Sequence, residues 1–434
     1  MTRGPDKPFL DNAATWNPRK KRLTVTIVRE VDSGIKSVAL NLSSGDVNIR
    51  GIVPQVSAPV PASELTTQLV IRARTEEKAR EMLARQGDKV KITTSPEGVA
   101  VTQEADTSIP TRKEQFLSSW RLLVDLWKGR EIDFSLLGRN PKLDVSLQAP
   151  GEEILYELNT NYGNIRVVDV RGKEGSAANT RTGDVYVGRS QGDFNATSGY
   201  GSMRVSEHKG DLTVRTETGE VMISAIEGDT HARTGYGDLI LDNIKGDAVG
   251  HTVTGSIDVT NVDGKAHVET GYGDIEAKQV TKGLHASTTT GNITGEHLSG
   301  NSDLSSGYGD IYAADVNGSL DVSTVTGNIE VQGISGSIHA ETGYGEVDVT
   351  NADLHGMNNR VAATTGNIQT SVLNDNLIVH AVSRTGDFQT SGLQIDRDSG
   401  DDWTVNSTAY VGSGISKNRI ELVTGYGDIY VTKR

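Results

Sequence analysis

A phased glycine repeat restricts the fold of this chain more than any other feature. The phrase Thr/Ser-Gly-Tyr-Gly-Asp/Glu/Ser recurs at intervals of 36 residues, and a second set of turn glycines lies midway between its copies. The underlying step is therefore 18 residues, as between Gly237, Gly255 and Gly273. A repeat of this length predicts a solenoid, because one unit alone cannot bury its apolar face and neighbouring units must stack.

Each 18-residue unit contains two strand-sized segments. Apolar residues alternate with mostly polar ones after each turn glycine, as at Ile257 and Val259, and a further glycine such as Gly264 opens the second segment. This period of two is typical of a half-buried strand, and the glycines and β-branched residues disfavour helix. We therefore expect a mainly β fold, a parallel right-handed β-solenoid with about 18 residues per coil.

The pattern divides the chain into three parts. Residues 1–22 are expected to be a flexible tail, residues 23–140 a small α+β region, and residues 141–434 the β-solenoid repeat domain. A helix predicted over 112–128 has an apolar stripe that includes Trp120, and we expect it to cover the open end of the solenoid. A membrane surface or a partner protein are alternative targets for that stripe.

Composition excludes several classes of protein. The formal net charge of −14 disfavours nucleic-acid binding, which needs a basic face. The chain has no cysteine, and hence no disulfide or cysteine-ligated metal, and no cofactor is predicted. Because no apolar run has the length of a signal peptide or a transmembrane segment, we expect a cytoplasmic protein. The alternative is a cell-surface protein exported by a route that the sequence does not reveal.

The tyrosines of the repeat are candidate binding residues. Stacked coils should place them along one edge, one in every second coil and about 10 Å apart, with threonines such as Thr254 and Thr290 between them. Two interpretations remain open. The adjacent glycine could make room for a packed ring, or the row of rings could stack against sugars or nucleobases. The candidates are Tyr200, Tyr236, Tyr272, Tyr308 and Tyr344.

Two other columns could bind metal. Acidic residues such as Asp274 and Asp310 follow the turn glycines, which resembles calcium-binding β-rolls in part, although Asp is also an ordinary turn residue. In the second strand, His267, His285 and Asp303 should occupy one outward column on successive coils, within reach of a shared ion. An outward column must be polar in any case, so a solvated face is the alternative.

The motif Thr-Gly-Tyr-Gly-Asp-Ile, as at 270–275, resembles the putative-adhesin family of β-strand repeat proteins, which is a domain of unknown function. The resemblance extends over about 141–433 and includes the lead-in strand Leu143–Pro150. It implies a β-solenoid and an adhesive role, and it brings no catalytic residues with it. More distantly, the stacked coils are similar to bactofilins, which are cytoplasmic β-helical filament formers.

The most direct functional prediction is a non-catalytic structural or adhesin-like binding protein with a long repetitive surface. Its partners would be a polymer or glycan ligand, or other copies of itself. The alternative is a β-helical carbohydrate-active enzyme, either a polysaccharide lyase or a hydrolase. An active site would interrupt the repeat, and such an interruption falls at 396–417, a stretch predicted to hold one irregular coil and a loop.

Overall fold

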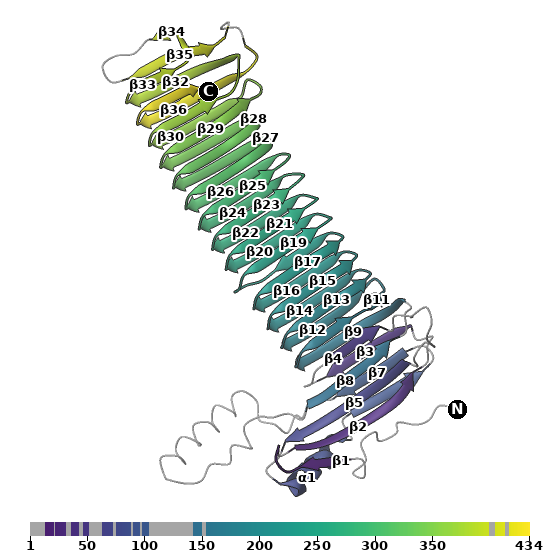
Figure 1. The fold of residues 1–434 in the computed structure, drawn as a ribbon. Coiled ribbons are helices and arrows are strands. Elements are labelled where there is room, and N and C mark those ends of the chain that lie inside the picture. The colour runs from purple at the N-terminus through teal and green to yellow at the C-terminus, as the bar shows by residue number, and fades with distance from the viewer. Residues whose placement is uncertain are drawn as a thin grey trace, which may run out of the picture. The chain divides into compact units, whose positions relative to one another are not determined.

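In the computed structural model, most of the described residues lie in strands (Figure 1). Contacts within the chain divide it into two units, Met1–Arg204 and Val205–Arg434. Among the described residues there is one helix, α1 (Glu76–Gly87). The described residues are 14–20, 22–31, 36–42, 47–51, 63–72, 75–87, 90–95, 98–103, 142–149, 153–398, 404–412 and 416–434.

The Val205–Arg434 unit is a parallel β-solenoid with the 18-residue coil that the repeat predicted. Each coil contributes one strand to each of two stacks, and successive coils pair in parallel. For example, Ile257 pairs with Leu239 on one side and with Ile275 on the other. The strands of its regular part are β16 (Leu212–Thr218), β17 (Val221–Glu227), β18 (Thr230–Arg233), β19 (Leu239–Ile244), β20 (Ala248–Thr254), β21 (Ile257–Val262), β22 (Ala266–Tyr272), β23 (Ile275–Val280), β24 (Leu284–Thr290), β25 (Ile293–Leu298), β26 (Ser302–Tyr308), β27 (Ile311–Thr326), β28 (Ile329–Tyr344) and β29 (Val347–Leu354), while β15 (Met203–Lys209) spans the boundary between the units.

The core consists of aliphatic columns in which like residues stack on like. Leu239, Ile257, Ile275 and Ile293 follow one another on successive coils and are all buried. Burying such a side chain contributes about 1.5–3 kcal/mol relative to leaving it in water. Because every coil repeats the same columns, each coil is stabilised mainly by its two neighbours.

A residue with positive φ bends the first strand of each coil. It lies six positions after the turn glycine, and examples are Asn243 (φ 54°), Gln279 (φ 57°) and Asp315 (φ 53°). The alternation of buried side chains breaks there, so that Leu241 and Ile244, three residues apart, both point into the core. The left-handed conformation is uncommon outside glycine, and the repeat pattern does not predict this bend.

The Met1–Arg204 unit begins its solenoid before residue 141. β3 pairs in parallel with β9, and β4 pairs in parallel with β10, so β3 and β4 belong to one coil of the stack. β7 and β8 lie on the other side of this coil, so the chain order and the stacking order differ. The strands are β1 (Ala14–Asn17), β2 (Arg22–Val31), β3 (Ser37–Leu42), β4 (Val47–Gly51), β5 (Ser63–Arg72), β6 (Val90–Ser95), β7 (Gly98–Gln103), β8 (Lys142–Ala149), β9 (Glu153–Tyr162), β10 (Ile165–Val168), β11 (Arg171–Gly172), β12 (Ser176–Thr182), β13 (Val185–Gln191) and β14 (Phe194–Tyr200).

Antiparallel strands finish the N-terminal end of this unit. β5 pairs antiparallel with β8, β2 with β5, and β1 with β2, while β6 pairs antiparallel with β7. β1 lies within the segment 1–22 that was expected to be a flexible tail. The helix expected over 112–128 lies outside the described residues, so the end cap that the structure does describe is built from strands.

The C-terminal end departs from chain order in the same way. β36 pairs on one side with β30 and on the other with β32, so the last coil in sequence is inserted before the coil that precedes it in the chain. β35 then pairs antiparallel with β32, and β34 with β35, so the prediction of an irregular coil in this stretch was wrong. These strands are β30 (Asn359–Thr365), β31 (Ile368–Val372), β32 (Leu377–Thr385), β33 (Phe388–Ser391), β34 (Gln394–Asp398), β35 (Val405–Val411), β36 (Arg419–Tyr426) and β37 (Ile429–Lys433).

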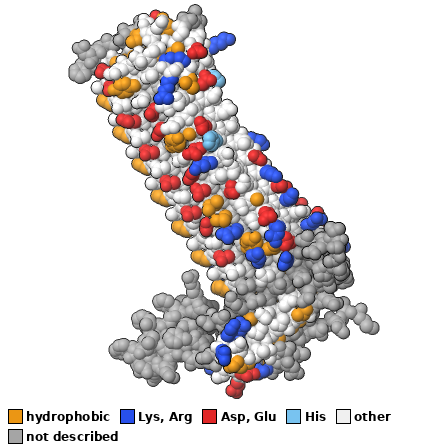
Figure 2. Space-filling view, viewed as in Figure 1, with side chains coloured by type: hydrophobic (Ala, Val, Ile, Leu, Met, Phe, Trp, Pro, Cys, Tyr) orange, Lys and Arg blue, Asp and Glu red, His pale blue; other side chains and the backbone are white. Residues whose placement is uncertain are grey.

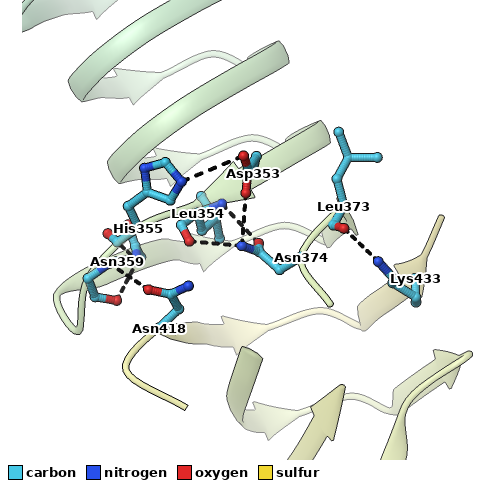
Figure 3. Close-up of polar contacts among 9 residues, drawn as sticks. Asp353, Leu354, His355, Asn359, Leu373, Asn374, Asn418 and Lys433 are labelled. Atoms are coloured by element: carbon cyan, nitrogen blue, oxygen red, sulfur yellow. Dashed lines mark hydrogen bonds and ion pairs between the residues drawn. The ribbon is translucent and has the colours of Figure 1, made fainter. Parts of the chain in front are cut away.

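Asparagine side chains join successive coils near the inserted coil, as Figure 3 shows for Asn374 and Leu354. Asn359, only 2% exposed, accepts the amide of Ile338 at 2.9 Å and donates to the carbonyl of Arg419 at 2.9 Å. Asn374 bonds in the same way to both the amide and the carbonyl of Leu354. These side chains replace ladder bonds where the coils no longer match in length.

Candidate functional site

The threonine of the repeated motif Thr-Gly-Tyr-Gly-Asp is a buried structural residue. Thr270 donates from Oγ1 to the carbonyl of Gly255 in the preceding coil at 2.9 Å. The same bond recurs from Thr234, Thr252, Thr288 and Thr342, each to the glycine 15 residues before it. It satisfies a turn carbonyl that the strand ladder leaves open.

Both glycines of the motif are required by the close approach of the preceding coil. A Cβ on Gly271 would lie 2.7 Å from the carbonyl oxygen of Val253, and one on Gly273 would lie 2.1 Å from that of Gly255. Gly273 also has a φ of 155°, which side chains rarely adopt. The glycine before the tyrosine therefore accommodates a backbone carbonyl and does not make room for a packed ring.

The acidic or amide residue of the motif links each coil to the next. Oδ1 of Asp274 accepts the backbone amide of Asn292 at 2.7 Å, Oδ1 of Asn292 accepts that of Asp310 at 2.9 Å, and Asp310 accepts that of Asn328 at 2.7 Å. Asp and Asn serve equally well in this bond, which explains why they interchange in the column. This arrangement gives the residues after the turn glycine a structural role as turn residues.

The tyrosine differs from the rest of the motif because its side chain points into solvent. In the Val205–Arg434 unit the tyrosines of this motif are between 55% and 63% exposed. Hydrophobic side chains recur at intervals along one edge of this unit, with acidic side chains beside them (Figure 2). The exposed tyrosines of the motif in this unit are called the tyrosine row; they are Tyr236, Tyr272, Tyr308, Tyr344 and Tyr426.

The inserted last coil extends the alternation of tyrosine and threonine. Tyr344 pairs with Thr365, Thr365 with Tyr426, and Tyr426 with Thr385. Tyr426 thus occupies the next tyrosine place after Tyr344, although it lies 82 residues further along the chain. Tyr426 was not among the predicted candidates, because its distance in sequence from Tyr344 departs from the 36-residue spacing.

The Met1–Arg204 unit presents two tyrosines in the same local setting. Tyr162 and Tyr200 are 50% and 56% exposed, and both pair with Thr182, which lies between them. Tyr200 was predicted as a candidate and Tyr162 was not, because its motif, Asn-Tyr-Gly-Asn, is the weakest copy. The exposed tyrosine is therefore a property of the coil in both units.

Histidines gather on the outer face of the second strand of the coils. His267 and His285 pair in register, and their rings stack with centroids 4.5 Å apart and planes inclined by 12°. Nε2 of His267 lies 3.1 Å from Oε1 of Glu269. One ligand atom from each of these three residues lies within 4.8 Å of the others.

Asp303 lies beside this cluster. It follows His285 in the column, as predicted, and its Oδ2 is 3.2 Å from Nδ1 of His285. The carboxylate that can reach both imidazoles is nevertheless that of Glu269, which the sequence analysis missed. Residues two apart on a strand share a face, so Glu269 could have been found by examining the column next to the histidines.

Part of the repeat region matches a known protein family. Residues 278–432 match the family described as Toastrack DUF4097. Over these residues the match confirms the resemblance predicted from the repeat motif, although it begins later in the chain than residue 141. No curated protein matches the chain.

Two solved structures of bacterial proteins are similar to this chain. One is a "putative cell adhesion protein" from Clostridium sporogenes, with 9% identity and a TM-score of 0.14, covering 95% of this chain and 100% of that one. The other is a "putative adhesin" from Bacteroides fragilis, with 11% identity and a TM-score of 0.24, covering 73% of this chain and 95% of that one. Among the described residues of this chain, no helix is long and apolar enough to cross a membrane.

Proposed function

We propose that this chain is a non-catalytic, adhesin-like binding protein and that the tyrosine row is its binding surface. One observation supports this most. Within the repeated motif, the threonine, both glycines and the acidic residue each meet a requirement of the neighbouring coil, whereas the tyrosine ring faces solvent. Aromatic rings exposed at regular intervals are typical of a surface that stacks against a ligand.

The spacing of the row favours an extended polymer. Two coils at about 4.8 Å each put neighbouring rings roughly 10 Å apart, which is close to the length of two sugar residues in an extended polysaccharide. Asp238, Asp274 and Asp310 stand two residues after their tyrosines, and each has a carboxylate that can accept hydrogen bonds from hydroxyl groups. With these acids and a net charge of −14, we propose a neutral or amine-bearing glycan over an acidic one.

Binding of the full chain to a panel of neutral, cationic and acidic polysaccharides tests the proposal. The variant Y236A/Y272A/Y308A/Y344A should lose binding, and Y272A alone should weaken it, because base or sugar stacking on one ring contributes about 1–3 kcal/mol. The matched control is T254A/T290A/T326A, which alters the same edge on the intervening coils. Equal loss in both variants would contradict a role specific to the rings.

Further measurements distinguish the glycan-binding proposal from a protein-binding role and from an enzyme. A proline-rich peptide has a repeat of about 9 Å, so preferential capture of such a peptide would replace the glycan with a protein partner. Release of oligosaccharides from any polysaccharide during incubation would indicate the lyase or hydrolase instead. Labelling intact and permeabilised cells with an antibody to the chain would distinguish an adhesin at the cell surface from a cytoplasmic binding protein.

A further inference from the structure

We propose that His267, Glu269 and His285 form a binding site for a divalent transition-metal ion of the Zn²⁺ type. The three residues lie on the outer face of β22 and β24, and one ligand atom of each lies within 4.8 Å of the other two. Two imidazoles and one carboxylate are a ligand set that Zn²⁺ and other divalent first-row transition metals use, whereas Ca²⁺ and Mg²⁺ prefer oxygen ligands alone.

The geometry of the parallel ladder brings the two imidazoles together. Because His267 and His285 are in register, their rings stack almost parallel, at 12°, with centroids 4.5 Å apart. Metal–nitrogen bonds of about 2.0–2.1 Å place two donors on one ion roughly 3.3 Å apart. The side chains are half-exposed, so small rotations about their side-chain bonds suffice to close the ligand set.

Neighbouring side chains orient these ligands. Oδ2 of Asp303 lies 3.2 Å from Nδ1 of His285, which leaves Nε2 of that ring for the ion. On the other side, Nδ1 of His251 lies 3.6 Å from Oε2 of Glu269, so Oε1 remains available. A carboxylate that holds the second nitrogen of a ligating histidine fixes the ring and its tautomer. Asp303, predicted from sequence as a ligand, is thus assigned the role of a positioning residue.

A second histidine–glutamate pair has only one imidazole and therefore provides a control. His339 and Glu341 repeat the pair two residues apart on β28, with Nε2 and Oε2 3.9 Å apart. The column neighbours of His339 are Asp321 and Arg360, so this copy has one imidazole and a nearby cation in place of two imidazoles. It should therefore bind Zn²⁺ far more weakly.

Calorimetric titration of the full chain with Zn²⁺ tests this proposal. We expect one site per chain, lost in H267N/H285N and in E269Q, and unchanged in H339N. D303N should weaken binding by about 10–100-fold, as is usual for a partner of a ligating histidine. Thermal unfolding of each variant without metal would show that the fold is retained.

Electron paramagnetic resonance with Cu²⁺ gives a second readout. Two coordinated imidazole nitrogens should produce superhyperfine splitting in the full chain, and H285N should reduce it to the pattern of one. A Zn²⁺ titration without heat, or a site that persists in H267N/H285N, would overturn the proposal. Polymer binding by the tyrosine row is independent of this outcome.

Discussion

Single residues of the repeated motif have separable roles. Thr270 and Asp274 hydrogen-bond to the backbone of neighbouring coils, and Gly271 and Gly273 allow that backbone to approach closely. Tyr272 is mostly exposed. Stability and binding should therefore respond to different substitutions within five consecutive residues.

Adjacent substitutions in one motif test this separation. G271A places a methyl group 2.7 Å from the carbonyl oxygen of Val253 and should destabilise the chain by about 1–3 kcal/mol. Y272A removes an exposed ring and should change stability by no more than about 0.5 kcal/mol. Urea unfolding followed by circular dichroism measures both. If Y272A cost as much as G271A, the ring would have a packing role that its exposure does not indicate.

Two aspartates should give opposite pH dependences. Partial burial raises the pKa of the largely exposed Asp258, with further increases from Glu276 and Asp238 and an opposing effect of Lys278. The hydrogen bond from Arg189 lowers the pKa of Asp169. The ionised form of Asp258 is thus disfavoured by folding and that of Asp169 favoured.

D258N should consequently stabilise the chain slightly at neutral pH, by no more than about 0.5 kcal/mol because the site is largely exposed. The gain should vanish as the pH falls below the ordinary range of a carboxyl group. D169N should destabilise at neutral pH, and its effect should also disappear as the pH falls through the lowered pKa of Asp169. Melting temperatures of both variants at several pH values check the signs, and a gain for D258N that grew in acid would contradict this assignment.

At the scale of elements, the coils share one sequence pattern, but their order in the stack differs from their order in the chain. β36 lies in the stack between β30 and β32. Where neighbouring coils differ in length, side chains supply the hydrogen bonds that the backbone ladder lacks. Asn359 is central because its one amide group contacts the coil before it and the inserted coil after it.

N359A should loosen the inserted coil. It leaves the buried amide of Ile338 and the carbonyl of Arg419 without these bonds, at a cost of about 1–3 kcal/mol. We expect faster hydrogen exchange across β36 and β37 in the variant, while β21 to β24 remain protected. The control N317A replaces an exposed asparagine of β27 and should have little effect. Uniform acceleration over all coils would indicate a global loss of stability instead.

For the whole molecule, the sequence was sufficient to predict the features that every coil repeats. It was not sufficient to predict features that vary between coils or occur only once. The coil length, the aliphatic columns and the alternation of tyrosine and threonine could be predicted, because each recurs in many coils. The exposure of the tyrosine rings could not, because the repeat is compatible with packed rings as well. The bend at residues such as Gln279 could not, because its residue type varies from coil to coil. The order of the last coils was also hidden, because the motif at Gly427 fits the stack equally well after Gly366 or after Gly386, and only tertiary contacts decide.

The antiparallel strands at the C-terminal end should prevent end-to-end association. β35 covers the free edge of β32, an edge whose unpaired backbone groups could otherwise recruit another chain. Thr408 lies within β35 and pairs with both His380 and Arg397. T408P removes its amide and cannot be accommodated between two paired strands, so this variant should expose β32 and form oligomers with rising concentration. T408V keeps the amide and should remain dispersed like the natural chain. Light scattering and electron microscopy would show the difference; filaments formed by the natural chain at high concentration would mean that these strands do not block assembly.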